Sequence, residues 1–196
     1  MDALVRETAA VVRALQERDD NTADHCGRAS GLALEIGRAC GLASSQLAAL
    51  ELTARLHDVG KIGIPDRVLL KPGRLDEEEL QIMRTHPRRG YDILIAIPRD
   101  EIANVADAVL HHHEACDGTG YPDKLRGEAI PLLSRILAVA DAYDALATVR
   151  PYHAPRSHAA IMTLLEERAS KYDASVLLAF NSIIESSAYR SRGGSA

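Results

Sequence analysis

The sequence predicts an all-α fold, and three observations lead to this prediction. The 196 residues include one Phe and no Trp. Ala and Leu dominate, and both favour helices. Apolar residues recur with a helical period, whereas the alternation of β-branched and aromatic residues that is typical of strands is nearly absent. This length fits one domain with at most a small extension.

In the first part of the chain the pattern predicts helices that alternate with polar or glycine-rich breaks. Gly41 ends the second helix, and Ser44 or Ser45 can cap the third. Asp76 followed by Glu79 resembles a capping box at the start of the fourth. Residues 60–75, with three Gly and two Pro, should form a loop. The helices are expected over residues 2–18, 22–40, 44–58 and 76–86.

The second part repeats this arrangement around another irregular stretch. Pro87 can open a helix at its first turn. Residues 116–131 are rich in Gly, Pro and Asp and should be a loop. The Gly/Ser-rich end, residues 191–196, is expected to be disordered. The remaining helices are expected over residues 100–113, 131–147, 155–170 and 173–187.

Charge and composition exclude several classes of protein. The net charge of −5 disfavours a general nucleic-acid binder, so neither DNA nor RNA is expected as a partner. No apolar run of about 18 residues is present, so membrane insertion is not expected, and the acidic start differs from a secretory signal. The three cysteines form no CxxC pair, which disfavours a disulfide scaffold or a thiolate zinc site. Reduced cysteines suit the cytoplasm, where we expect the protein.

The dipeptide His57-Asp58 is the first candidate for chemistry. On a helix, His57 shares a face with Leu50 and Ala54, so its side chain should point into the core. Buried charge is unfavourable unless it has a partner, and a metal ion could partner both side chains. Taken alone, the dipeptide fits a histidine bonded to a backbone carbonyl better than it fits a ligand.

Other histidines and acids shift this balance toward a metal centre. Three consecutive histidines span residues 111–113, and several further His and Asp residues lie on apolar helix faces or at helix ends. Together they provide seven candidate ligands: His25, His57, Asp58, His86, His112, His113 and Asp141. Imidazoles and carboxylates without thiolates suit Fe, Mn, Zn or Ni. Seven donors exceed what one ion needs, so we expect two ions, bridged by Asp58, as in metal-assisted phosphodiester hydrolysis.

Longer motifs resemble the HD-GYP phosphodiesterase family. Residues 56–66, LHDVGKIGIPD, resemble its HD motif, and residues 112–122, HHEACDGTGYP, resemble its GYP motif. The resemblance continues through THP at 85–87, AVADAYDAL at 138–146 and RPY at 150–152. It covers about residues 19–180, nearly the whole chain.

The resemblance implies an HD-domain helical bundle with a metal centre in its core. We accordingly divide the chain into an N-terminal helix (1–18), a catalytic domain (19–187) and a flexible tail (188–196). The implied reaction is hydrolysis of the bacterial second messenger cyclic di-GMP to pGpG, in many members onward to GMP, by a metal-bridging hydroxide. Fe or Mn is the expected metal. A diguanylate cyclase or another signalling protein could bind at the GYP loop, and a homodimer is compatible with the sequence.

Carried over by position, the resemblance also assigns roles to single residues. The seven candidate ligands match the metal ligands of the family, and His111 lies outside that set. Asp58 and Lys61 become the catalytic residues. Tyr121 could stack on a guanine or fix its loop, and Glu114 and Asp117 could support the histidines or lie on the surface. The substrate-binding residues are then Lys61, Gly120, Tyr121, Pro122, Arg150 and His153.

The sequence departs from the family pattern at three points. Asn21 stands where some members carry a Glu that binds a third ion, which favours two ions here, although Asp20 or Asp24 could substitute. His153 stands where a basic residue is common, so binding of the second phosphate of the cyclic dinucleotide could be weaker or pH-dependent. The chain carries no sensory or receiver domain, so we expect a free-standing protein or an excised catalytic domain.

Three alternatives stay open at this point. The chain could be an HD-fold hydrolase of another nucleotide. It could be a non-catalytic cyclic di-GMP receptor or interaction module, although such a protein would be expected to have lost ligands. It could also be a di-iron oxygenase, but Lys61 and Arg150 would then have no role.

Overall fold

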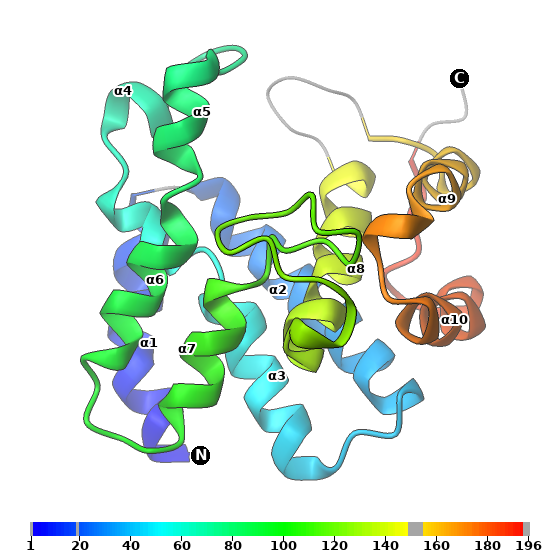
Figure 1. The fold of residues 1–196 in the computed structure, drawn as a ribbon, viewed down its shortest axis with the longest axis horizontal. Helices are drawn as coiled ribbons and strands as arrows, with labels where there is room; N and C mark the ends of the chain where they lie inside the picture. The colour runs from blue at the N-terminus through cyan, green and yellow to red at the C-terminus, as the bar shows by residue number, and fades with distance from the viewer. Residues whose placement is uncertain (1, 19, 149–154, 194–196) are drawn as a thin grey trace.

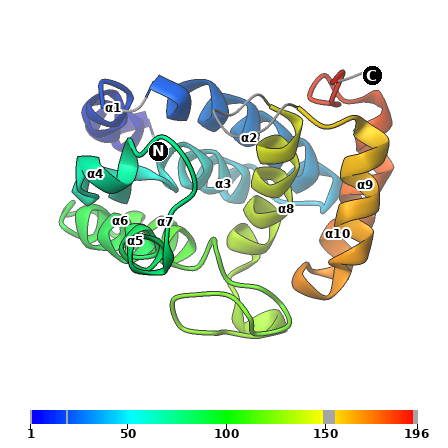
Figure 2. The ribbon, with the colours of Figure 1, turned by 90° about the horizontal axis from the view of Figure 1, so that it is seen from above.

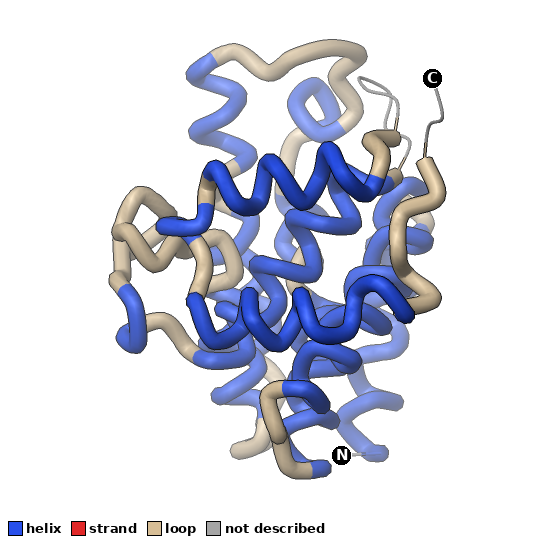
Figure 3. The backbone as a smooth tube through the Cα atoms, turned by 90° about the vertical axis from the view of Figure 1, so that its right-hand side faces the viewer, coloured by secondary structure: helices blue, strands red, loops and turns tan. Residues whose placement is uncertain are grey.

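The computed structural model describes residues 2–18, 20–148 and 155–193, and the side chains of residues 2–7, 16 and 20–26 lie outside that description. The prediction of an all-α fold is confirmed: every regular element of the described residues is helical (Figure 3). The α-helices are α1 (Asp2–Gln16), α2 (Asp20–Ala39), α3 (Ser44–Leu56), α4 (Asp66–Leu69), α5 (Glu77–Met83), α6 (His86–Ile95), α7 (Ile102–Leu110), α8 (Leu132–Ala147), α9 (His158–Glu167) and α10 (Ala174–Ile183). Short 3-10 helices are η1 (Val59–Gly63), η2 (Gly127–Ala129), η3 (Ala169–Lys171) and η4 (Ile184–Ser186).

Two hydrophobic cores lie on either side of α3. One joins α2, α3 and α8 to α9 and α10 through fully buried side chains such as Leu50, Tyr143 and Phe180. The other joins α3 and η1 to α6 and α7 through Leu56, Val59 and Val109. Figures 1 and 2 show α1, α6 and α7 on one side of the molecule and α9 and α10 on the other, with the long loop between α7 and α8 projecting from one face.

An ion pair fixes α2 against α8. The Nε of Arg28 lies 2.8 Å from Oδ1 of Asp144, whose side chain is buried. A buried carboxylate needs such a partner, since an unpaired charge in the interior is strongly unfavourable. Arg28 lies one helical turn after His25, and Asp144 lies one turn after Asp141. The pair therefore sets the register between the two helices that carry candidate ligands.

Several helix ends differ from the prediction, and the differences lie where functional residues are placed. The capping box of Asp76 and Glu79 is confirmed, with both hydrogen bonds at 2.9 Å. The helix that it opens ends at Met83, so His86 begins α6 instead of ending a helix as predicted. Pro87 then occupies the first turn, where its missing N–H removes no helical bond. Similarly, α7 ends at Leu110, and residues 111–113 form a turn.

The predicted loop over residues 60–75 contains η1 and α4. Arg18, just beyond α1, fastens this segment: its guanidinium donates hydrogen bonds to the carbonyls of Ile62 and Ile64 and to the carboxylate of Asp66. These partners are more than 40 residues away along the chain, so no local pattern predicts the contact.

The first residues of the expected tail pack against the helices. The N–H of Ser191 donates to the Tyr143 hydroxyl at 2.9 Å, and the Ser191 hydroxyl donates to the carbonyl of Arg156 at 2.8 Å. His158 also bonds Tyr143, at 2.8 Å, and faces Glu185 at 2.9 Å. None of the described helices is long and apolar enough to cross a bilayer.

Candidate metal centre

Four segments bring histidines and carboxylates together between the two cores. His57 and Asp58 follow the end of α3, His86 begins α6, and His112 and His113 follow α7. Apart from His113, which is half-buried, these side chains are buried. Asp141, on α8, lines a cavity together with His112 and His113. The predicted inward placement of His57 is confirmed.

A glycine allows two of these segments to approach closely. A Cβ on Gly60 would lie 1.9 Å from the carbonyl oxygen of His86 and 2.5 Å from the backbone nitrogen of Gly90. These are backbone atoms, so no side-chain movement could relieve the clash. Gly60 therefore lets η1 lie directly on α6 and brings Asp58 next to His86.

The backbone fixes the orientation of three imidazoles. The Nδ1 atoms lie at hydrogen-bond distance from carbonyls three residues earlier: 2.8 Å for His57 and Ala54, 2.9 Å for His86 and Met83, and 2.6 Å for His112 and Val109. A carbonyl can only accept, so Nδ1 carries the proton in each ring. The opposite atom, Nε2, then carries a lone pair in place of a proton, as a metal ligand requires.

The unprotonated Nε2 atoms lie close to the carboxylate of Asp58 or to one another. The Nε2 atoms of His86 and His112 lie 3.3 Å apart. The Asp58 oxygens lie 3.4 Å from Nε2 of His57 and 3.4 Å from Nε2 of His86. In the neutral tautomers all of these atoms are acceptors, so they repel one another unless a cation lies among them. Lys61 supplies one cation, with its Nζ 2.7 Å from Oδ2 of Asp58.

The protonation states suit metal binding. Burial lowers the pKa values of three histidines of the site. The pKa of His86 is lowered, that of His112 falls well below its usual range, and that of His113 falls to about 3. These rings are therefore neutral. Burial alone would raise the pKa of Asp58, but the charge and hydrogen bond of the Lys61 ammonium outweigh it and hold that pKa well below its usual range. The site thus offers neutral imidazoles and an ionised carboxylate.

The donors can hold a divalent ion. One donor atom from each of His86, His112 and His113 can be chosen so that the three lie within 4.8 Å of one another. Asp141 is close enough for its charge to oppose the lowering of the His113 pKa. Nitrogen and oxygen donors without sulfur suit first-row ions such as Fe, Mn or Zn.

The loop between α7 and α8 packs directly on the histidines. The Tyr121 ring lies 4.9 Å from the His113 ring, at an interplanar angle of 31°. A Cβ on Gly120 would lie 2.3 Å from the backbone nitrogen of Ala115, so only glycine permits this approach. The peptide bond before Pro122 is cis. Tyr121 therefore forms a wall of the site.

Two buried side chains, Glu114 and His111, form hydrogen bonds that hold this loop. Glu114 accepts hydrogen bonds from the backbone N–H groups of Asp123 at 2.7 Å and Leu125 at 3.1 Å. Its bonds thus run to the loop backbone, which differs from both predicted alternatives, support of the histidines and a place on the surface. His111 faces the Asp107 carbonyl at 2.9 Å through Nδ1 and the Asp123 carboxylate at 3.0 Å through Nε2.

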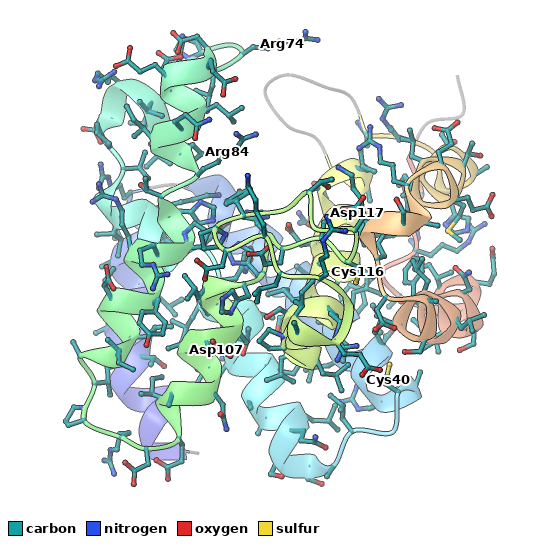
Figure 4. All side chains as sticks on the ribbon, viewed as in Figure 1. Cys40, Arg74, Arg84, Asp107, Cys116 and Asp117 are labelled. Atoms are coloured by element: carbon teal, nitrogen blue, oxygen red, sulfur yellow. The ribbon has the colours of Figure 1, made fainter. Side chains whose placement is uncertain are left out.

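Asp117 also serves the loop. Its carboxylate accepts from the N–H and hydroxyl of Thr119, at 2.9 and 2.6 Å, and from the hydroxyl of Ser170 at 3.2 Å. These bonds join the loop to η3. Figure 4 shows Asp117 on the side of the loop that faces η3.

A cavity of about 290 Å³ opens beside the histidines and includes residues that sequence reasoning did not select. Arg84 lies two residues before His86, and Lys171 and Tyr172 come from η3 and the residue after it. Proximity to His86 is a weak signal for Arg84, whereas no sequence signal marks η3. The lining comprises Arg84, His112, His113, Glu114, Ala115, Thr119, Gly120, Tyr121, Ala138, Asp141, Ala142, Lys171 and Tyr172.

Six of the residues discussed in the sequence analysis lie outside the described part of the molecule, among them Asp20 and Asp24, whose side chains are not described. The backbone of α2 places residues 21 and 25 on its first turns, but the side chains of Asn21 and His25 are not described. Arg150 and His153 belong to the segment 149–154, which is not described at all. Their predicted roles stay predictions.

Comparison with known proteins identifies relatives over most of the chain. A family model described as HD domain matches residues 5–176. The chain is 45% identical over 170 residues to the cyclic di-GMP phosphodiesterase response regulator RpfG of Xanthomonas campestris, covering 86% of this chain and 45% of that protein. It is 38% identical over 145 residues to 3'3'-cGAMP-specific phosphodiesterase 2 of Vibrio cholerae, covering 74% of this chain and 28% of that protein. The chain thus spans less than half the length of these relatives.

Solved structures share the fold. The match to Bd1817, a HDG"Y"P protein from Bdellovibrio bacteriovorus, has a TM-score of 0.65 at 22% identity and covers 84% of this chain and 52% of the other. At this identity the likeness supports the arrangement of the helices alone. The predicted HD-domain fold is confirmed.

Proposed function

We propose a function from one premise: the chain belongs to the HD domain family. The proposal is that it is a metal-dependent phosphodiesterase that hydrolyses cyclic di-GMP to pGpG, with GMP as a further product. The observation that carries it is the convergence of unprotonated imidazole nitrogens and the Asp58 carboxylate, with separations of 3.3–3.4 Å. Such a set of acceptors is favourable only around a cation.

The proposed ligands would hold two divalent ions. His57, His86 and His112 direct their unprotonated Nε2 atoms toward the Asp58 carboxylate or toward one another, and Asp58 offers two oxygens, so it can bridge. His113 and Asp141 complete the described set, and His25 is proposed as a further ligand. Fe and Mn fit these donors. Bound ions of this kind act as Lewis acids and lower the pKa of coordinated water toward neutrality.

The other residues of the chain would bind and orient the substrate. Lys61 lies beside Asp58 and can place its ammonium against a phosphate oxygen, where it would stabilise developing negative charge. Gly120 and Tyr121 form a wall of the adjoining cavity. Of the two roles predicted for Tyr121, stacking on a guanine and fixing the loop, the second is favoured because the Tyr121 ring packs against His113. Arg150 and His153 are proposed phosphate contacts.

A second candidate is hydrolysis of 3'3'-cGAMP, which the Vibrio cholerae relative favours by its name. The identity to RpfG is higher and extends over more of this chain, which supports cyclic di-GMP as the first substrate to test. A non-catalytic receptor is disfavoured because the described candidate ligands all occupy or line one site.

The test is product analysis with matched variants. The purified chain is loaded anaerobically with Fe(II) or Mn(II), incubated separately with cyclic di-GMP and 3'3'-cGAMP, and the products are separated by chromatography. We expect pGpG from cyclic di-GMP, loss of turnover in Asp58→Asn, and normal turnover in Asp92→Asn, an exposed aspartate on α6. Faster hydrolysis of 3'3'-cGAMP would move the assignment to the second candidate. No hydrolysis of either compound by metal-loaded protein would overturn the proposal.

A further inference from the structure

Two cations of unassigned role line the cavity beside the metal centre. Arg84 is the C-cap residue that follows α5, and Lys171 is the last residue of η3. They lie 87 positions apart in the sequence, and both line the cavity that contains His112, His113 and Asp141. In Figure 4, Arg84 lies just beyond α5, on the side of that helix toward α8.

Both side chains are held near the loop and remain available to a ligand. The Arg84 guanidinium lies 5.7 Å from the centroid of the Tyr121 ring, a distance at which cations and aromatic faces attract. Its ion pair with Glu77 is long, at 4.0 Å. The Lys171 carbonyl accepts from the N–H of Cys116 at 2.9 Å, which ties η3 to the loop while the Lys171 side chain stays exposed.

The size and charge of the cavity suit part of an anionic ligand. A volume of about 290 Å³ is at the lower end for small-molecule sites, so it would hold a portion of a cyclic dinucleotide. Such a substrate carries two phosphodiesters. The metal centre and Lys61 account for one of them. The second remains an anion that the carboxylates of Asp58 and Asp141 would repel unless other cations faced it.

We propose that Arg84 and Lys171 form a subsite for the phosphodiester that is not being hydrolysed. Arginine can bind phosphate oxygens with two parallel hydrogen bonds, and lysine adds a compact charge. This inference rests on the proposed function. It adds two residues to Arg150 and His153, which the sequence alone connects with phosphate binding.

The experiment compares substrates with one and two phosphodiesters. Arg84→Gln, Lys171→Gln and the double variant are assayed with cyclic di-GMP and with bis(p-nitrophenyl) phosphate, which has a single phosphodiester. Arg74→Gln and Lys124→Gln are the controls, because both residues are exposed and lie outside the cavity lining. We expect KM for cyclic di-GMP to rise about tenfold in each single variant and further in the double variant, with kcat within about twofold. Kinetics with bis(p-nitrophenyl) phosphate should not change.

Two further arms separate the sources of an effect. Cyclic di-AMP has the same two phosphodiesters as cyclic di-GMP but different bases. Its KM should therefore rise by the same factor in the Arg84 and Lys171 variants. A rise confined to cyclic di-GMP would mean that the two side chains contact guanine, and would overturn the phosphate assignment. An equal loss with bis(p-nitrophenyl) phosphate would mean that Arg84 only supports Tyr121, and would also overturn it.

Equilibrium dialysis with labelled cyclic di-GMP makes the result independent of turnover. If the wild-type chain binds but does not hydrolyse the compound, the proposed function fails, yet a tenfold weaker Kd in the variants would still support the subsite. Unchanged KM and Kd in the double variant would overturn the subsite and leave the proposed function intact. A wild-type chain that does not bind cyclic di-GMP would overturn both.

Discussion

Replacing Glu114 by Gln tests whether the loop over the metal centre is held by one buried carboxylate. In the structure both oxygens of Glu114 accept from backbone N–H groups, at 2.7 and 3.1 Å, and the residue is 5% exposed. Gln keeps the shape and one acceptor. It places an NH₂ group against the second N–H, so that one hydrogen bond is lost and two donors face each other.

The expected loss follows from these two bonds. Hydrogen bonds to a charged group contribute about 1.5–3 kcal/mol each, whereas a neutral bond contributes about 0.5–1.5 kcal/mol. Exchanging two of the first kind for one of the second lowers the stability of the closed loop by roughly 3 kcal/mol. For a chain of this size, about 2–4 °C of Tm corresponds to each kcal/mol, so Tm should fall by roughly 6–12 °C.

Limited proteolysis reports on the same loop directly. Lys124 is exposed and lies between the two N–H groups that Glu114 holds. A loss of about 3 kcal/mol raises the open population roughly a hundredfold, and trypsin cleavage after Lys124 should accelerate accordingly when opening is fast relative to cleavage. The control is Glu128→Gln, an exposed glutamate of η2 in the same loop. Equal Tm and equal cleavage rates in the two variants would refute the reasoning.

Three other predictions follow from the site and its surroundings. Asp58→Asn should bind less metal by elemental analysis, and added Mn(II) at about 100 times its Kd should raise the Tm of the wild type, corresponding to about 2.7 kcal/mol, but not that of the variant. Lys61→Met should keep its metal while kcat falls roughly 10–100-fold, since it removes a charge beside the phosphate; an unchanged kcat would refute this. Burial alone would raise the pKa of Asp173, but hydrogen bonds from Ser175, Val176 and Arg135 lower it from 3.8 to about 2. The ionised group therefore stabilises the fold above about pH 4 and loses that effect toward pH 2, so Asp173→Asn should be about 2 kcal/mol less stable at pH 7 and approach the wild type in acid, as urea unfolding at several pH values would measure.

The sequence predicts the helices and the metal-binding chemistry because both depend on local patterns. The helical period places His57 on a buried face, and the structure confirms that placement. The chemistry of the donors is independent of exact geometry, so a set of histidines and carboxylates can be selected before the fold is known. Helix ends are less certain, because a residue such as His86 can end one helix or begin the next at similar local free energy.

Long-range contacts account for what could not be predicted. Nothing in the neighbourhood of Lys171 distinguishes it from a surface lysine, and only the packing of η3 on the loop brings it to the cavity. Glu114 follows two candidate ligands directly, which suggests support of the histidines. Its carboxylate turns instead to the loop, because the backbone N–H groups of residues 123 and 125 have no partner within a helix.

The convergence of acceptors has a consequence for stability as well as for chemistry. In the metal-free chain Lys61 offsets the charge of Asp58, but the unprotonated Nε2 atoms of His86 and His112 still face each other at 3.3 Å, and this repulsion opposes folding. A divalent ion reverses the sign of these interactions and stabilises the folded state by its binding free energy. In His86→Gln the amide NH₂ can turn toward Nε2 of His112, which relieves the repulsion, while the loss of an imidazole ligand weakens metal binding. Without metal, the variant should therefore be no less stable than the wild type. With metal bound, the wild type should be the more stable of the two. Residues retained for packing alone would destabilise both forms when changed, so this reversal separates a metal centre from a cluster of core histidines.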